Sequence, residues 1–126
     1  MSRFDGDRLD DITAAIEAIR SHVARGPLSD DLVSDAVRIW LLEIGEAVKS
    51  LSDELTASEP EIPWKQIARM RDHLAHRYFM TEVEIIRDTV DNDLDPLLAA
   101  VEHMRALLPP ETDDEAETDD ETEASE

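Results

Sequence analysis

The chain contains no cysteine, and this absence removes several kinds of chemistry at once. Disulfide bonds, thiolate metal sites and cysteine nucleophiles are excluded, and a cytoplasmic location is expected. No apolar stretch approaches the ~18 residues of a membrane span, and the first residues show no signal-peptide pattern. We therefore expect a protein that is neither embedded in a membrane nor exported by a signal peptide.

Basic residues are scarce. The chain has 12 Lys and Arg against 32 Asp and Glu, a net charge of −20, and Lys49 and Lys65 are its only lysines. Ten of the acids fall in residues 111–126, where no basic residue occurs, so we expect a disordered acidic tail after a helical domain at 1–110. A polyanion is normally a poor partner for RNA. The acidic composition resembles that of salt-adapted organisms, in which salt screens this repulsion, with a GC-rich soil bacterium as the alternative.

Glycine is also rare, with three residues, and no glycine-rich phosphate loop, strand-like alternation or internal repeat occurs. Apolar residues recur at helical spacing in four stretches, which predict amphipathic helices over residues 4–23, 32–51, 64–79 and 83–108. Pro96 and the turn-prone residues before it predict a kink or a break into two helices. The expected fold is an all-α, up-and-down bundle of four to five helices, whose small core would gain from pairing in a homodimer.

Local signals place the ends of these helices. Residues 55–62 are expected to form a connecting loop, because Ser58 and Pro60 interrupt the apolar pattern there and Pro63 follows directly. The end signals are Gly26-Pro27 after the first helix, Ser29 or Asp30 as the cap of the second, Pro63 as the first residue of the third, and a capping box from Thr81 to Glu84 at the start of the fourth.

Two helices have distinctive apolar patterns. The core stripe of the first is predicted to begin at Phe4. The second is apolar around much of its circumference, with Leu32 and Ile39 in the pattern, so it is expected to be central. Gly45 in the middle of that helix costs up to ~1 kcal/mol relative to alanine, and it therefore predicts a close approach to another helix.

Residues 64–79, WKQIARMRDHLAHRYF, concentrate the basic side chains that the rest of the chain lacks. By composition alone they describe an ordinary amphipathic helix with an apolar core face and a solvated basic face. The alternative is a functional, locally positive surface in an otherwise acidic protein. Asp72 is the only acidic residue in residues 64–79. The basic residues of this segment are Lys65, Arg69, Arg71, His73, His76 and Arg77.

The order of residues in this segment is informative. Arg71, His76 and Tyr78 fit the pattern R-x-x-x-x-H-x-Y, and the segment with its surroundings resembles the HepT-like members of the HEPN superfamily over roughly residues 9–104. The chain departs from the common pattern at Asp72, where asparagine more often follows the arginine. The further matching positions are Ile44 to Ala47, Trp64, Ile67, Tyr78 to Met80 and Val83 to Ile86.

The resemblance implies a homodimeric endoribonuclease toxin that cleaves RNA, with tRNA as a substrate by analogy, and that uses no metal or other cofactor. Arg71 would hold the scissile phosphate, and His76 would act as general acid or base. The resemblance also implies a nucleotidyltransferase antitoxin, in a type VII toxin–antitoxin system, that silences the toxin by AMPylation of Tyr78. Supporting positions are Glu46, Asp72, His73 and Arg77.

Helix geometry bears on how such a site is assembled. Arg71 and His76 lie about 140° apart around a helix and roughly 7.5 Å apart along it, so they do not share a face. Asp72 and His76 do share one, and Asp72 could orient the imidazole or be merely solvated. A site that uses both Arg71 and His76 is most easily completed by a second copy of the helix across a two-fold axis.

Other interpretations stay open. The acidic balance and Asp72 also suit a non-catalytic helical module that binds a nucleotidyltransferase. The acidic segment 111–126 could act as an RNA mimic that covers the basic cleft. The spacings of Asp72, His73 and His76 could gather a metal ion, but no glutamate-plus-histidine motif occurs on another helix, so no metal site is predicted.

Overall fold

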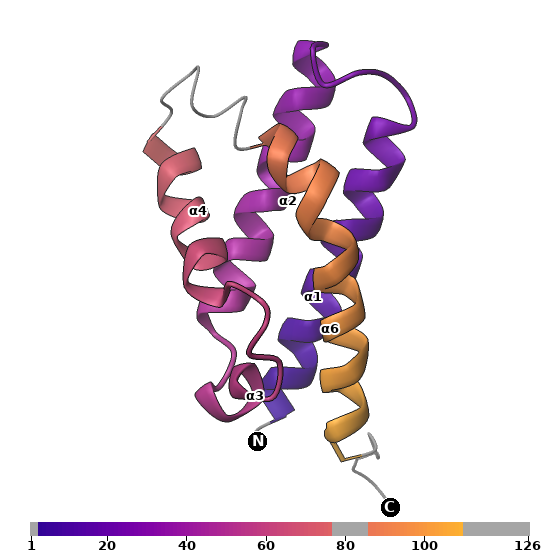
Figure 1. Cartoon of the computed structure of the whole chain (residues 1–126). Helices are drawn as coiled ribbons and strands as arrows, with labels where there is room; N and C mark the ends of the chain where they lie inside the picture. The colour runs from indigo at the N-terminus through magenta and orange to yellow at the C-terminus, as the bar shows by residue number, and fades with distance from the viewer. Residues whose placement is uncertain (1–2, 77–85, 110–126) are drawn as a thin grey trace, which may run out of the picture.

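The computed structural model describes residues 3–76 and 86–109, and these residues form a bundle of helices (Figure 1). Neither range contains a β-strand. The predicted all-α fold class is thereby confirmed. The elements in chain order are α1 (Arg3–Val23), α2 (Asp31–Lys49), α3 (Asp53–Ala57), α4 (Trp64–His76), the π-helical turn η1 (Thr89–Asp93) and α6 (Leu94–Leu107).

Helix α2 is the middle of the bundle, as its apolar sequence predicted. It packs against α1 on one side and α4 on the other, while α6 lies along α1 (Figure 1). The core is continuous between these helices, because each of them contributes fully buried aliphatic side chains. The residues at its centre include Leu9, Ile12, Ile16, Leu41, Ile44, Leu74, Val101 and Met104.

The helix boundaries follow local capping chemistry. Asp30 caps α2, since its carboxylate accepts a hydrogen bond from the backbone N–H of Leu32 at 2.9 Å. Helix α4 begins at Trp64, where the predicted range 64–79 begins. The Pro63 carbonyl accepts from the backbone N–H of Ile67 at 3.0 Å, so Pro63 precedes the helix instead of forming its first residue.

The prediction of a loop over residues 55–62 is wrong in part, because α3 includes residues 55–57. The Ser52 hydroxyl accepts from the backbone N–H of Leu55 at 3.3 Å and caps this short helix. Asp5 of α1, only 2% exposed, in turn accepts from the Ser52 backbone N–H at 3.0 Å and from its hydroxyl at 2.9 Å. A contact between residues 47 positions apart therefore stabilises α3, and no local sequence pattern predicts this contact.

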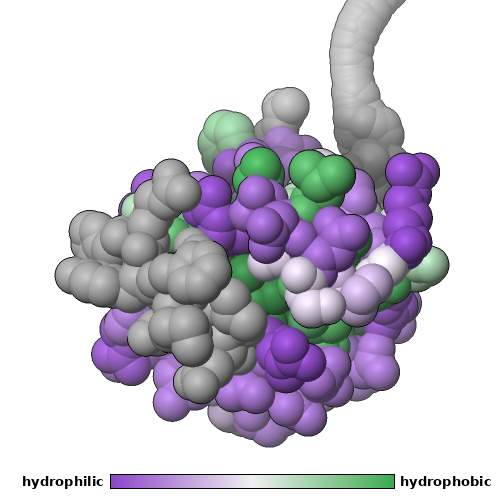
Figure 2. All heavy atoms as spheres, turned by 90° about the horizontal axis from the view of Figure 1, so that it is seen from above, coloured by the Kyte–Doolittle hydropathy of each residue, from purple (hydrophilic) through white to green (hydrophobic). Residues whose placement is uncertain are grey.

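Several apolar residues assigned to the core are in fact exposed. Phe4 is 67% exposed, since it lies five residues before Leu9 and therefore about 140° away from the buried stripe of α1. Leu32 and Ile39 are 81% and 53% exposed, because α1 and α4 do not cover the whole circumference of α2. Figure 2 shows apolar surface among polar side chains at the end of the bundle where α1 passes to α2. No described helix is long and apolar enough to span a bilayer.

The irregularity expected near Pro96 takes the form of a π-helical turn. Residues 86–107 stay helical throughout, and η1 lies just before α6, so the predicted break into two separate helices is wrong. Pro96 lies in the first turn of α6, directly after η1, and it has no N–H to donate to the preceding helical turn. Burial, and secondarily the charge of Asp88, raises the pKa of the Asp93 carboxyl at the end of η1. The capping box from Thr81 to Glu84 lies outside the described residues.

Candidate active site on helix α4

Helices α2 and α4 approach closely at Gly45, as its position in mid-helix predicted. A Cβ atom added to Gly45 would lie 2.6 Å from the Cβ of Arg71 and 3.3 Å from the carbonyl oxygen of Ile67. Such distances leave no room for a side chain, so glycine is required for this separation of the two helices. The close approach places the next residue of α2, Glu46, beside Arg71.

Arg71 is held between two carboxylates. Its Nε lies 2.9 Å from Oε1 of Glu46 on α2, and its Nη1 lies 3.2 Å from Oδ1 of Asp72. The arginine side chain remains 40% exposed. A guanidinium has five N–H donors, and the hydrogen bond to Asp72 uses one of them, on Nη1. The outer edge formed by Nη1 and Nη2 therefore keeps donors for a phosphate group.

Three of the remaining predicted site residues, Asp72, His73 and His76, lie in the second half of α4. Asp72 and His73 are exposed. His76 is the last residue of α4, and its backbone position is five residues beyond Arg71, on a different face of the helix. The side chain of His76 lies outside the described residues, as do Arg77 and Tyr78. The sequence suggested that Asp72 could orient His76 or be merely solvated, and the described residues do not include the His76 side chain. The Asp72 carboxylate accepts a hydrogen bond from Nη1 of Arg71.

The charge of α4 differs from that of its neighbours. Lys65, Arg69 and Arg71 oppose a single acid, Asp72, so α4 is the only described helix with a positive formal charge. No group of three His, Asp or Glu side chains in the described part of the chain is arranged to hold a metal ion. The described side chains that contact one another at this site are therefore the guanidinium of Arg71 and the carboxylates of Glu46 and Asp72.

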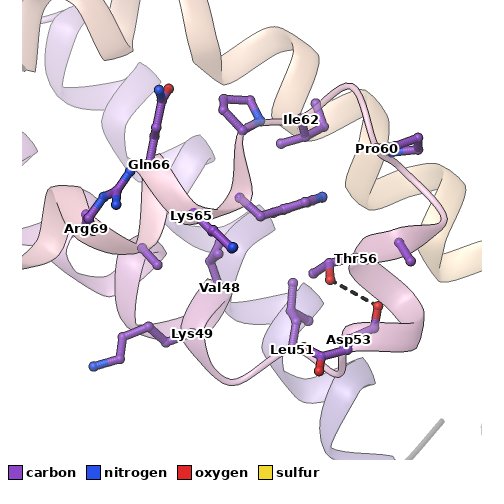
Figure 3. A pocket seen from close by; sticks show the side chains of 14 residues that line it. Val48, Lys49, Leu51, Asp53, Thr56, Pro60, Ile62, Lys65, Gln66 and Arg69 are labelled. Carbon is purple, nitrogen blue, oxygen red and sulfur yellow. Dashed lines mark hydrogen bonds between the residues drawn. The ribbon is translucent and has the colours of Figure 1, made fainter.

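Sequence reasoning missed one basic residue near this helix. Lys49, at the end of α2, lines a groove together with Lys65 and Arg69 (Figure 3). The sequence feature that could have drawn attention to Lys49 is the scarcity of lysine, because Lys49 and Lys65 are the only two in the chain. Their convergence depends on how α2 packs against α4, which no local pattern specifies.

The substitution Gly45→Ala tests the close approach. It is expected to lower the free energy of unfolding by about 1 kcal/mol, because overpacking against Arg71 costs roughly 1–3 kcal/mol and improved helix propensity returns about 1 kcal/mol. For a domain of this size the melting temperature should fall by roughly 4–8 °C in a calorimetric scan.

Gly6→Ala is the matched control for this substitution. Its added Cβ would meet Leu108 Cδ1 at 3.7 Å, an ordinary contact, so the variant should gain helix propensity without strain. A Gly45→Ala protein as stable as Gly6→Ala would contradict the close approach of α2 and α4.

Comparisons with known proteins agree with this arrangement. The family model described as "Ribonuclease HepT-like" matches residues 11–104. The chain is 35% identical over 109 residues to "Probable ribonuclease HepT" of Thermococcus cleftensis, covering 83% of this chain and 99% of that protein. It is 40% identical over 77 residues to "Putative RNase MJ0127" of Methanocaldococcus jannaschii, covering 61% and 64% of the two chains.

A third similar protein is also named as a ribonuclease. "Putative RNase TTE0752" of Caldanaerobacter subterraneus is 38% identical over 85 residues, which cover 64% of this chain and 76% of that one. No solved structure matches the chain. The all-helical fold and the match over residues 11–104 define the class, and the chain belongs to the ribonuclease HepT-like family.

Proposed function

We propose that the protein is a metal-independent endoribonuclease whose active site uses Arg71 and His76 at the interface of a homodimer. The observation that supports this most is the state of Arg71. Its guanidinium is exposed at the surface of the one positively charged helix among those described, fixed by Glu46 and Asp72, and still has N–H donors to offer. A fixed guanidinium is suited to the charge that develops on a phosphate during cleavage.

The proposed reaction is transfer of the phosphate to the neighbouring ribose oxygen. The 2′-oxygen attacks phosphorus, the bond between phosphorus and the 5′-oxygen breaks, and a cyclic 2′,3′-phosphate remains. His76 takes the proton from the 2′-hydroxyl, and the leaving 5′-oxygen gains a proton from the imidazolium so formed or from water, so each site needs one Arg71 and one His76. Arg71 stabilises the added negative charge on the phosphate oxygens.

The surface of α2 supports a dimer that would bring two such sites together. Leu32, Ile39 and Glu46 are spaced by seven residues, so they lie along one face of α2. The first two are exposed and apolar, and the third contacts Arg71. A second copy that covers Leu32 and Ile39 would therefore lie next to Glu46 and Arg71.

We further propose that the enzyme is the toxin of a toxin–antitoxin pair and acts on RNA such as tRNA. A nucleotidyltransferase antitoxin would silence it by adding AMP to Tyr78, two residues after His76. The added phosphate would bring negative charge near Arg71 and compete with the substrate for it. This part of the proposal rests on the family and on the spacing of Arg71, His76 and Tyr78.

One observation favours a second candidate function. Glu46 and Asp72 already neutralise the charge of Arg71, and this arrangement would also suit a non-catalytic module that binds a nucleotidyltransferase. In that case the carboxylates would hold Arg71 as a structural link between α2 and α4. RNA would then be neither bound at Arg71 nor cut.

Cleavage of RNA in EDTA separates the two functions. The purified protein is expected to cut transcribed tRNA in excess EDTA, at salt concentrations from about 0.1 to 1 M, and to leave fragments that end in a cyclic phosphate. Fragment ends can be identified by mass spectrometry. Intact RNA under all of these conditions, together with a stable complex with the nucleotidyltransferase, would favour the binding module.

A further inference from the structure

A groove separates the end of α2 and α3 from the first turns of α4, away from the contact between Arg71 and Glu46. Figure 3 shows Lys49 at the end of α2 and Lys65 and Arg69 on neighbouring turns of α4. The floor of the groove is apolar and is formed in part by Val48 and Leu51. The groove thus combines apolar surface with three cationic side chains.

The cations of the groove differ from several other arginines in the described part of the protein. Arg8, Arg20 and Arg105 each form an ion pair with a carboxylate. In the described ranges neither lysine of the groove nor Arg69 has such a partner, and all three side chains are exposed. Asp53 is the one acidic residue among the residues that line the groove. With three cations and one carboxylate, the residues that line the groove have a net formal charge of 3 − 1 = +2.

This charge continues toward the proposed catalytic histidine. Lys65, Arg69 and His76 are separated by four and seven residues, so their positions lie within about 40° of one another around α4. Eleven residues of helix span roughly 16 Å. A nucleic-acid backbone that passes position 76 along this face of α4 would meet Arg69 and then Lys65.

We infer that this groove binds the phosphate backbone of an RNA chain on one side of the cleaved bond, through Lys49, Lys65 and Arg69. The inference rests on the proposed function and adds a binding surface outside the catalytic pair. The groove gives an acidic protein a local attraction for RNA, and it requires a substrate several nucleotides long. Its apolar floor suits the sugar and base faces of an unpaired strand.

Binding of a non-cleavable RNA tests the groove without relying on catalysis. The probe is a fluorescent single-stranded 12-mer with 2′-O-methyl groups, which the proposed reaction cannot cut. The triple variant Lys49→Gln, Lys65→Gln, Arg69→Gln should bind it about 100-fold more weakly than the wild type near 0.1 M salt, because each lost contact no longer releases counterions. The slope of log affinity against log salt concentration should fall by about 2.

The control removes three cations elsewhere. The variant Arg20→Gln, Arg25→Gln, Arg105→Gln has the same net charge, and its binding should stay within about threefold of the wild type. Helical circular dichroism checks that both variants fold. Equal binding by the two triple variants would overturn the inference.

Two further measurements distinguish RNA binding in the groove from catalysis and from binding of the acidic segment. If the wild type cuts RNA, the triple variant should cut a dinucleotide normally, since that substrate is too short to reach the groove. Absence of cleavage by the wild type would remove the proposed function but leave the binding test intact. A peptide of residues 111–126 that binds the wild type but not the triple variant, with RNA binding unchanged, would assign the groove to the acidic segment and overturn the inference.

Discussion

Arg71→Ala is expected to lower the rate of RNA cleavage by roughly 100- to 1000-fold, the usual cost of removing a group that stabilises transition-state charge. His76→Ala should cost at least about 100-fold, because the reaction would lose its general acid or base. Rates are measured in EDTA under single-turnover conditions. Helical circular dichroism should be unchanged in both variants.

Two controls sharpen the test of Arg71. Arg71→Lys keeps the charge but loses the planar pair of donors, so its rate should fall between those of wild type and Arg71→Ala. Arg25→Ala removes an exposed arginine beyond the end of α1 and should leave the rate unchanged. Cleavage that survives both Arg71→Ala and His76→Ala would reject the assigned roles.

Mixing the two inactive variants tests whether one site draws on two subunits. In a heterodimer of Arg71→Ala and His76→Ala, one site would lack both groups and the other would have both. Since random exchange makes half of the dimers mixed, about one quarter of wild-type activity should return. No recovery after verified subunit exchange would argue against a site shared in this way.

Ile39→Glu is expected to convert the protein to a monomer and to abolish cleavage. The substitution buries a carboxylate in the proposed contact along the Leu32 and Ile39 face of α2, and an unpaired buried charge costs several kcal/mol. Light scattering coupled to size exclusion measures the change of mass. The same samples can be assayed for cleavage.

The matched control for Ile39 is Leu107 on α6. Both residues are aliphatic and both are 53% exposed, so Leu107→Glu makes a similar chemical change on another helix. That variant should remain dimeric and active. A dimer that resists Ile39→Glu but dissociates in Leu107→Glu would place the interface elsewhere.

The amino-acid sequence by itself determined the four long helices and the segment in which to look for chemistry. Apolar residues at helical spacing specified α1, α2, α4 and α6, because each helix must bury one face. The close approach at Gly45 and a helix cap at Ser29 or Asp30 could also be predicted, because each depends on local space or hydrogen bonding, and the structure assigned the cap to Asp30. The motif from Arg71 to Tyr78 likewise depends on positions close together in sequence.

Only the tertiary structure decided which distant groups meet. Arg71 contacts Glu46 on another helix, and Asp5 of α1 supports α3. Lys49 and Lys65, from α2 and α4, line the same groove. The exposure of Phe4 and Ile39 was likewise misjudged from pattern alone. The physical reason is common to all of these cases: periodicity fixes which face of a helix is apolar, whereas the packing of its neighbours fixes how much of that face is covered and what lies opposite each side chain.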